Sequence, residues 1–102
     1  MFKKGVSSAI EMEEKVEKLN FALNESKPAT NRMLAFAGKM SSQSLFGKGA
    51  IMEAETFALS LGRSEEQTKK MVVAAMGLSR VTGVDLQTAM SQLNMTYSRG
   101  VS

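Results

Sequence analysis

The chain has no histidine and no cysteine, so the candidate catalytic side chains considered first are its clustered serines and its acidic residues. Thiol nucleophiles, imidazole bases, disulfides and the usual zinc sites are therefore excluded. Three serines gather at Ser41, Ser42 and Ser44. A serine hydroxyl is a weak nucleophile without an adjacent base, and here no histidine can supply one.

The acidic residues do not form a catalytic pair either. Glu53 and Glu55 project from different faces of a predicted helix, and Glu65 and Glu66 belong to a helix start. Neither pair converges as a general acid and base would. The single aspartate, Asp85, has no acidic neighbour within several residues, so nothing indicates a carboxylate metal site. We expect no enzyme activity, no cofactor and no metal.

Composition indicates a small, mostly helical domain. The 102 residues are 43% hydrophobic and 23% charged, with one proline and nine methionines. A methionine-rich core is adaptable because this side chain fills irregular gaps. The net charge is +3, but the lysines and arginines are scattered along the chain. This distribution favours a solvated surface over a nucleic-acid footprint.

No targeting or membrane segment is indicated. The start, "MFKKGVSSAIEMEE", has two lysines but no apolar stretch after them, unlike a signal peptide. The longest apolar run, 71–78, is too short to span a bilayer. We expect synthesis in the bacterial cytoplasm and no membrane span.

Apolar periodicity predicts an all-α fold of about five short helices in a hairpin-like arrangement. The expected helices are 8–24, a short helix that includes Met33–Met40, and then 50–61, 65–81 and 86–98. The stretch "GKMSSQSLFGKG", 38–49, is rich in glycine and serine and is expected to be a loop or a frayed region between two halves. The chain, 1–102, is interpreted as a single helical domain or fragment. A possible subdivision is an N-terminal helical pair, 1–47, and a three-helix segment, 48–102.

Local signals mark the ends of these helices. Pro28 suits the first turn of the second helix, with Ser26 or Thr30 as its cap. Gly62 and Gly83 each end a helix, since glycine readily adopts the positive φ that such ends require. Ser64 and Gln67 predict a capping box, and Asp85 caps the last helix. These residues explain both turns without a ligand.

A candidate interaction surface consists of apolar residues at helical spacing. Met12, Val16, Leu19 and Leu23 form a stripe on the first helix. Any face of the later helices left uncovered adds to it, through Met71, Met76, Met90 and Met95. The alternative is that the same residues simply form the core. A surface of this kind predicts self-association or packing on another protein chain.

A DNA-reading alternative rests on Gly77-Leu78-Ser79, which is similar to the turn of bacterial helix-turn-helix repressors. Ser79, Arg80 and Thr82 would then face the major groove. Against it, Gly83 would fall inside the recognition helix, at a cost of about 1 kcal/mol relative to alanine. Val84-Asp85 is also a better signal for the end of one helix and the start of the next.

Residues 50–102 resemble part of phage tail tape measure proteins. The similar stretches are "ALSLGRS" (58–64), "MVVAAMGLS" (71–79), "TGVDLQTAM" (82–90) and "YSRG" (97–100). The resemblance implies a helical, non-enzymatic protein that sets tail length, with tail tube and chaperone proteins as partners and the virion as its location. Whole proteins of this kind are several times longer, so we expect this chain to be a fragment or a small phage-derived protein. A further alternative is a small phage-encoded helical protein that binds a host complex.

Overall fold

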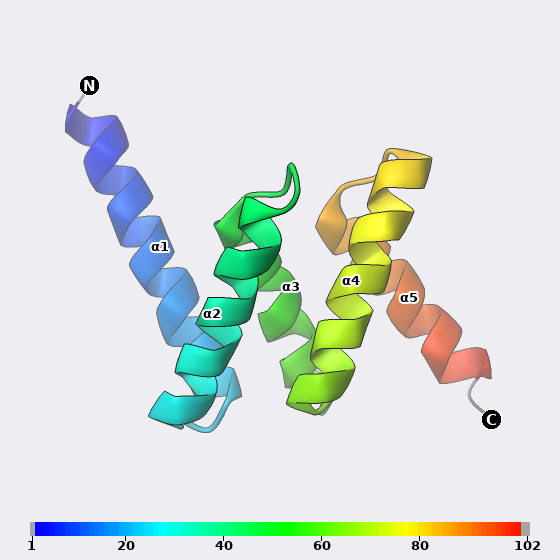
Figure 1. Cartoon of the computed structure of the whole chain (residues 1–102). Coiled ribbons are helices and arrows are strands. Elements are labelled where there is room, and N and C mark those ends of the chain that lie inside the picture. The colour runs from blue at the N-terminus through cyan, green and yellow to red at the C-terminus, as the bar shows by residue number, and fades with distance from the viewer. Residues whose placement is uncertain (1, 101–102) are drawn as a thin grey trace.

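The computed structural model describes the backbone of residues 2–100 and the side chains of residues 10–96. This part of the chain consists of five α-helices and contains no strand, which confirms the all-α prediction. The helices are α1 Phe2–Ala22, α2 Lys27–Ser42, α3 Lys48–Ser60, α4 Glu65–Thr82 and α5 Leu86–Gly100 (Figure 1). Across the described range, none of these helices combines the length and the apolar character that a membrane crossing needs.

The central helix is α3, which contacts each of the other four. In Figure 1, α2 and α4 lie in front of α3, while α1 and α5 lie at opposite ends of the molecule. The chain neighbours α1 and α2 also pack together, as do α4 and α5. The fold is therefore built around one short helix that buries one broad face against the others.

The core draws on residues from both halves of the chain. Its larger cluster comprises Ala37, Ile51, Met52, Ala54, Ala58, Met71, Val72, Ala75, Met76, Leu86, Ala89 and Met90. A smaller cluster joins Leu19 of α1, Met33 of α2 and Leu59 of α3. Residues from 1–47 and from 48–102, the two parts suggested by the sequence, thus contribute to the same hydrophobic clusters. Side chains of α3 belong to both clusters.

The first helix starts earlier and ends earlier than predicted. It begins at Phe2 rather than Ser8, since no proline interrupts the residues before Ser8. It ends at Ala22 because Asn24 and Glu25 adopt left-handed φ angles of 58° and 61°. The Glu25 amide donates to the Asn20 carbonyl at 2.8 Å and the Asn24 amide donates to the Phe21 carbonyl at 3.0 Å. This is the hydrogen-bond pattern of a Schellman motif, made here without glycine.

Ser26 is the cap of α2, and Pro28 lies in its first turn as predicted. The Ser26 hydroxyl accepts a hydrogen bond from the Ala29 amide at 3.3 Å. Thr30, the other candidate cap, has a different role. It is buried, and its hydroxyl contacts the Asn20 side-chain oxygen and the Ser26 carbonyl, each at 2.8 Å. Thr30 therefore ties the start of α2 to the end of α1.

The loop predicted for 38–49 is mostly helix. α2 continues through Gly38 to Ser42, and α3 begins at Lys48, which leaves only 43–47 as a loop. The burial of Ala37 and the packing of Met40 against the core keep α2 helical past Gly38. The serines act locally: Ser41 donates to the Phe46 carbonyl at 3.0 Å. Tertiary packing here outweighs the weak helix preference of glycine and serine.

The turn between α3 and α4 is set by Gly62 and Ser64. Gly62 has a φ of 88°, its amide donates to Leu59, and the Arg63 amide donates to Ala58 at 3.2 Å, which completes a Schellman motif. The Ser64 hydroxyl accepts from the Gln67 amide at 3.1 Å, and the Gln67 side chain accepts from the Ser64 amide at 2.9 Å. This is the predicted capping box.

The turn between α4 and α5 uses a different hydrogen-bond pattern. Gly83 has a φ of 85°, and its amide donates to the Ser79 carbonyl at 2.8 Å, which is the simpler left-handed cap. Asp85 starts α5 by accepting hydrogen bonds from the Thr88 amide at 3.3 Å and the Thr88 hydroxyl at 2.6 Å. These hydrogen bonds hold the pKa of Asp85 below its ordinary value. The two glycine turns thus serve the same purpose with different geometry.

Two glycines of the α4 region give alanine substitutions of opposite sign. Gly83→Ala should destabilise the fold by about 1 kcal/mol, because alanine resists positive φ, and Gly83→Val should cost more than that. Gly77 lies inside α4 with open space where a Cβ would be placed, so Gly77→Ala should stabilise by up to about 1 kcal/mol. Urea unfolding of the variants measures both. Equal effects at the two positions would contradict the assignment of Gly83 as the end of α4.

The capping box gives a second test, with a matched serine as control. Ser64→Ala removes the side-chain acceptor at the start of α4 and should destabilise the fold by about 1 kcal/mol. Ser60 is also exposed, but its hydroxyl only donates to the Phe57 carbonyl within α3. Ser60→Ala should therefore leave the melting temperature nearly unchanged. A Ser64→Ala variant as stable as the parent would show that the box contributes nothing.

Candidate functional site

The predicted stripe on α1 is only partly available as a surface. Met12 is 38% exposed, Val16 and Leu23 are half-buried, and Leu19 is fully buried. Exposure therefore falls from Met12 to Leu19 as α1 reaches α3 and α2. Leu19 belongs to the core rather than to an interaction surface, because Met33 and Leu59 pack against it. The uncovered part of the stripe lies at the Met12 end.

Three of the four methionines proposed for the later helices are also core. Met71 and Met90 have no exposed surface and Met76 is 9% exposed, since the turn at Gly83 folds α5 back onto α4 and both pack on α3. Met95, near the end of α5, is 54% exposed. For Met71, Met76 and Met90, the alternative that they form the core is therefore the correct one.

Several exposed apolar side chains were not anticipated from the sequence. Phe21 is 75% exposed and lies beside a hollow of ≈ 750 Å³ between α1 and α3, which Thr56 and Ser60 also line. Ile10 lies eleven residues before Phe21, on the same side of α1. Helical spacing alone places both away from the Met12 stripe. The others are Leu45, Leu61, Val73 and Val81.

Each acidic candidate considered from the sequence has a different neighbour. Glu53 forms an ion pair with Lys15 of α1, with an Nζ to Oε2 distance of 3.2 Å. Gly49 makes room for that lysine, since a Cβ there would lie 2.9 Å from the Lys15 nitrogen. Glu66 lies 4.0 Å from Lys69. Glu53 and Glu66 thus lie beside different lysines.

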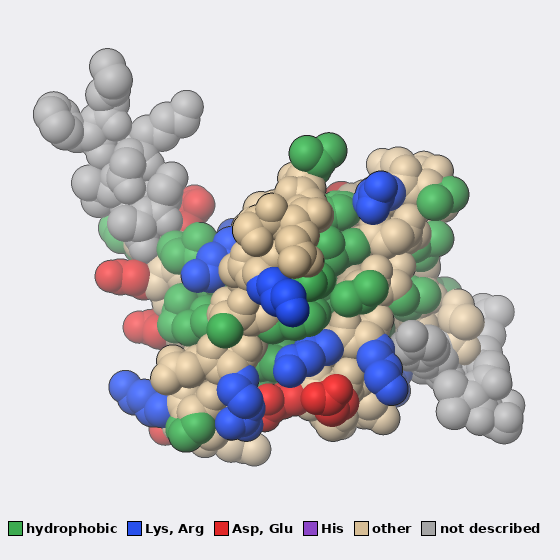
Figure 2. All heavy atoms as spheres, in the orientation of Figure 1, with side chains coloured by type: hydrophobic (Ala, Val, Ile, Leu, Met, Phe, Trp, Pro, Cys, Tyr) green, Lys and Arg blue, Asp and Glu red, His purple; other side chains and the backbone are tan. Residues whose placement is uncertain are grey.

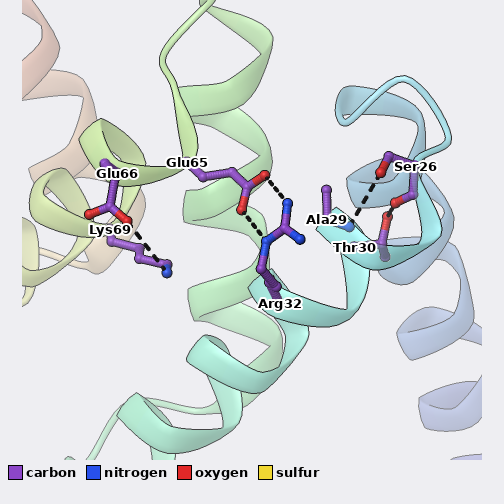
Figure 3. A network of polar contacts seen from close by, with 7 residues as sticks. All are labelled: Ser26, Ala29, Thr30, Arg32, Glu65, Glu66 and Lys69. Atoms are coloured by element: carbon purple, nitrogen blue, oxygen red, sulfur yellow. Dashed lines mark hydrogen bonds and ion pairs between the residues drawn. The ribbon is translucent and has the colours of Figure 1, made fainter.

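Glu65 joins the start of α4 to α2. Arg32 donates two hydrogen bonds to its carboxylate, from Nε at 3.0 Å and from Nη2 at 2.8 Å (Figure 3). The hydrogen bond and charge of Arg32 hold the pKa of Glu65 below its ordinary value. Close by, the Lys69 ammonium lies 5.8 Å from the centre of the Phe36 ring on α2. Both contacts bridge α2 and α4 at the surface, where such pairs stabilise weakly.

Glu55 is the one acid of the four without an exposed surface. Neither of its carboxyl oxygens has a hydrogen-bond partner. Burial raises its pKa to about 8, and the positive charges of Lys69 and Lys48 oppose that rise. The sequence carried a signal for this: Glu55 is four residues after Ile51 and three before Ala58, so it lies on the apolar stripe of α3.

The segment behind the DNA-reading alternative has no turn at Gly77-Leu78-Ser79. α4 runs through these residues and ends only at Thr82. Ser79 is 8% exposed, and its hydroxyl donates to the Val84 carbonyl. It faces the α4–α5 turn, so it is not on the surface of a recognition helix. Arg80 and Thr82 are exposed in the last turn of α4.

The site features are therefore exposed apolar side chains, on the terminal helices and also on α4 and the connections, and a buried carboxyl on the central helix. Among the described residues, no group of three acidic side chains gathers as a metal site would require. In comparisons with known proteins, no family, no curated protein and no solved structure matches this chain.

Proposed function

We propose that this chain is a helical, non-enzymatic structural segment of the phage tail tape measure type, which works by packing against other protein chains. The resemblance of residues 50–102 motivates the family. Two of its stretches contain Gly62-Arg63-Ser64 and Gly83-Val84-Asp85, which form the turns before and after α4. The residues that carry the resemblance are thus residues that shape the helical body.

The observation that carries the proposal is the apolar surface of the two terminal helices. Met12, 38% exposed, continues the apolar stripe of α1 whose other members are covered by the fold. Met95, 54% exposed, lies on the outer face of α5, nine residues after the buried Leu86. In Figure 1, α1 and α5 extend from opposite ends of the molecule, so a partner chain can reach both. Exposed apolar side chains of this kind are suited to helix packing. Partners are a second copy of the chain, or tail tube and tail chaperone proteins.

The proposed setting follows from the same family. The protein would be made in the bacterial cytoplasm and then become part of the phage tail. Within the tail, its role would be to pack along other helical or tube-forming chains rather than to transform a substrate. Co-sedimentation of the chain with the tail tube protein and tail chaperones of the same phage tests this. A chain that stays monomeric and binds none of them would overturn the proposal.

Charge substitutions locate the surface. The double variant Met12→Glu with Met95→Glu should weaken association at least tenfold, because burying a methionine contributes about 1.5 to 3 kcal/mol and a buried carboxylate opposes contact. Sedimentation across a concentration series measures this, and far-UV circular dichroism checks that the helices persist.

The matched control is Val73→Glu with Val81→Glu on α4, where the parent side chains are 51% and 85% exposed. This pair adds the same charge to exposed apolar positions that belong to neither α1 nor α5, so association should be unchanged. If the α4 pair abolishes association and the methionine pair does not, the contact surface lies on α4 and the assignment to the terminal helices is wrong.

A further inference from the structure

The Glu55 side chain is buried within the central helix of the fold. It occupies the middle of α3, which contacts every other helix. Its exposed fraction is zero, and both carboxyl oxygens are without hydrogen-bond partners. Thr68 of α4 is also fully buried with an unpartnered hydroxyl. Glu55 lies seven positions before Gly62 and Thr68 lies six positions after it. The α3–α4 hairpin therefore places them at similar distances from the turn.

This arrangement is tolerable only while the carboxyl is neutral. A buried ionised carboxylate loses its hydration and needs a charged partner or several hydrogen bonds to compensate. Glu55 has neither within the core. A glutamine or leucine of similar size would fill the same place without that penalty. The stability of the packed helices therefore depends on whether the Glu55 carboxyl is protonated.

The charges around Glu55 indicate where an ionised carboxylate would move. Lys69 on α4 and Lys48 on α3 are the cations that act on it, and both reach the surface. Two cations on the other helices already have acidic partners: Lys15 of α1 pairs with Glu53, and Arg32 of α2 pairs with Glu65. On α5, no charged residue occurs between Leu86 and Thr96. Attraction therefore draws the carboxylate outward, towards Lys69 and Lys48.

On the side of the molecule towards which it would move, the polar contacts between α2 and α4 lie at the surface, where such contacts stabilise weakly. α2 and α4 are bridged by the exposed Arg32–Glu65 pair and by Lys69 over Phe36. Figure 2 shows hydrophobic side chains between α2 and α4, with lysines and arginines beside them. Parting these two helices would hydrate Glu55 and bring it to the lysines, while the capped α3–α4 turn stays intact.

We infer that Glu55 is a proton-dependent latch: with a neutral carboxyl α2 and α4 stay closed over α3, and loss of the proton parts them. This device is independent of the proposed function, since it requires no partner chain. It would give the folded segment two states, one compact and one with the central helix exposed between α2 and α4.

The direction of the pH dependence follows from the raised pKa. Because the carboxyl titrates at about 8 when folded and near 4.5 when solvated, the closed state binds the extra proton between these values. The opening equilibrium constant should therefore rise by up to tenfold for each pH unit across this window. Below it, the carboxyl is protonated in both states and opening is independent of pH.

Carbon-13 NMR of the glutamate carboxyls in the parent chain tests the latch directly, between pH 4 and 9. Glu55 should titrate well above the other glutamates. Backbone amides facing the α2–α4 gap should shift or broaden with the same midpoint, while those of Leu86–Thr96 change little. A Glu55 that titrates with the exposed glutamates would overturn the inference. So would one that titrates late while the α2 and α4 amides stay unchanged.

Variants give an independent reading by urea unfolding at pH 5 and pH 8. The parent should lose stability between these values, whereas Glu55→Gln should not, since it cannot ionise. Glu53→Gln, two residues away and exposed, should follow the parent. If Glu55→Gln does not fold, Glu55→Leu serves in its place, and the NMR titration of the parent remains decisive. A parent as stable at pH 8 as at pH 5 contradicts the latch.

Discussion

The structure depends on the packing of four helices around α3. A helix of thirteen residues that contacts four others needs a broad apolar face, and Ile51, Met52, Ala54, Ala58 and Leu59 form it. The alanines bring neighbouring backbones close because their side chains are short. α1 and α2 are connected to α4 and α5 mainly through their contacts with α3. A substitution in α3 therefore affects the packing of every other helix. Glu55 lies within this set, which gives one side chain unusual influence over the fold.

The turns determine which helices meet. The Schellman motif and capping box around Gly62 bring α4 back along α3, and the left-handed cap at Gly83 brings α5 back along α4. At the α1–α2 turn the same task is done by Asn24 and Glu25 in left-handed conformation. Each turn satisfies its own backbone groups, so the connections hold their shape without a ligand. The packing of α3 and these local turns therefore reinforce one another.

The features that sequence predicted well are those decided within a few residues. The capping box at Ser64, the glycine ends at Gly62 and Gly83 and the cap at Asp85 depend on neighbouring backbone groups alone. The features that the sequence did not predict depend on contacts between residues that are far apart in the chain. Helix α2 continues past Gly38 because Ala37 packs into the core, and Met71 and Met90 are buried because α3 covers them. Glu55 was considered as half of a possible pair with Glu53, while its position on the apolar stripe carried the more important information.

The uneven burial of the methionines also has a consequence for oxidation chemistry. A methionine thioether reacts with peroxide to give a polar sulfoxide, and the reaction requires access to the sulfur. Met33, Met52, Met71 and Met90 have no exposed surface, whereas Met12 and Met95 are open to solvent. Mild oxidation would therefore convert the ends of the molecule to a polar form and leave its centre intact. Oxidative damage would therefore reach the exposed methionines of α1 and α5 before it reached those of the core.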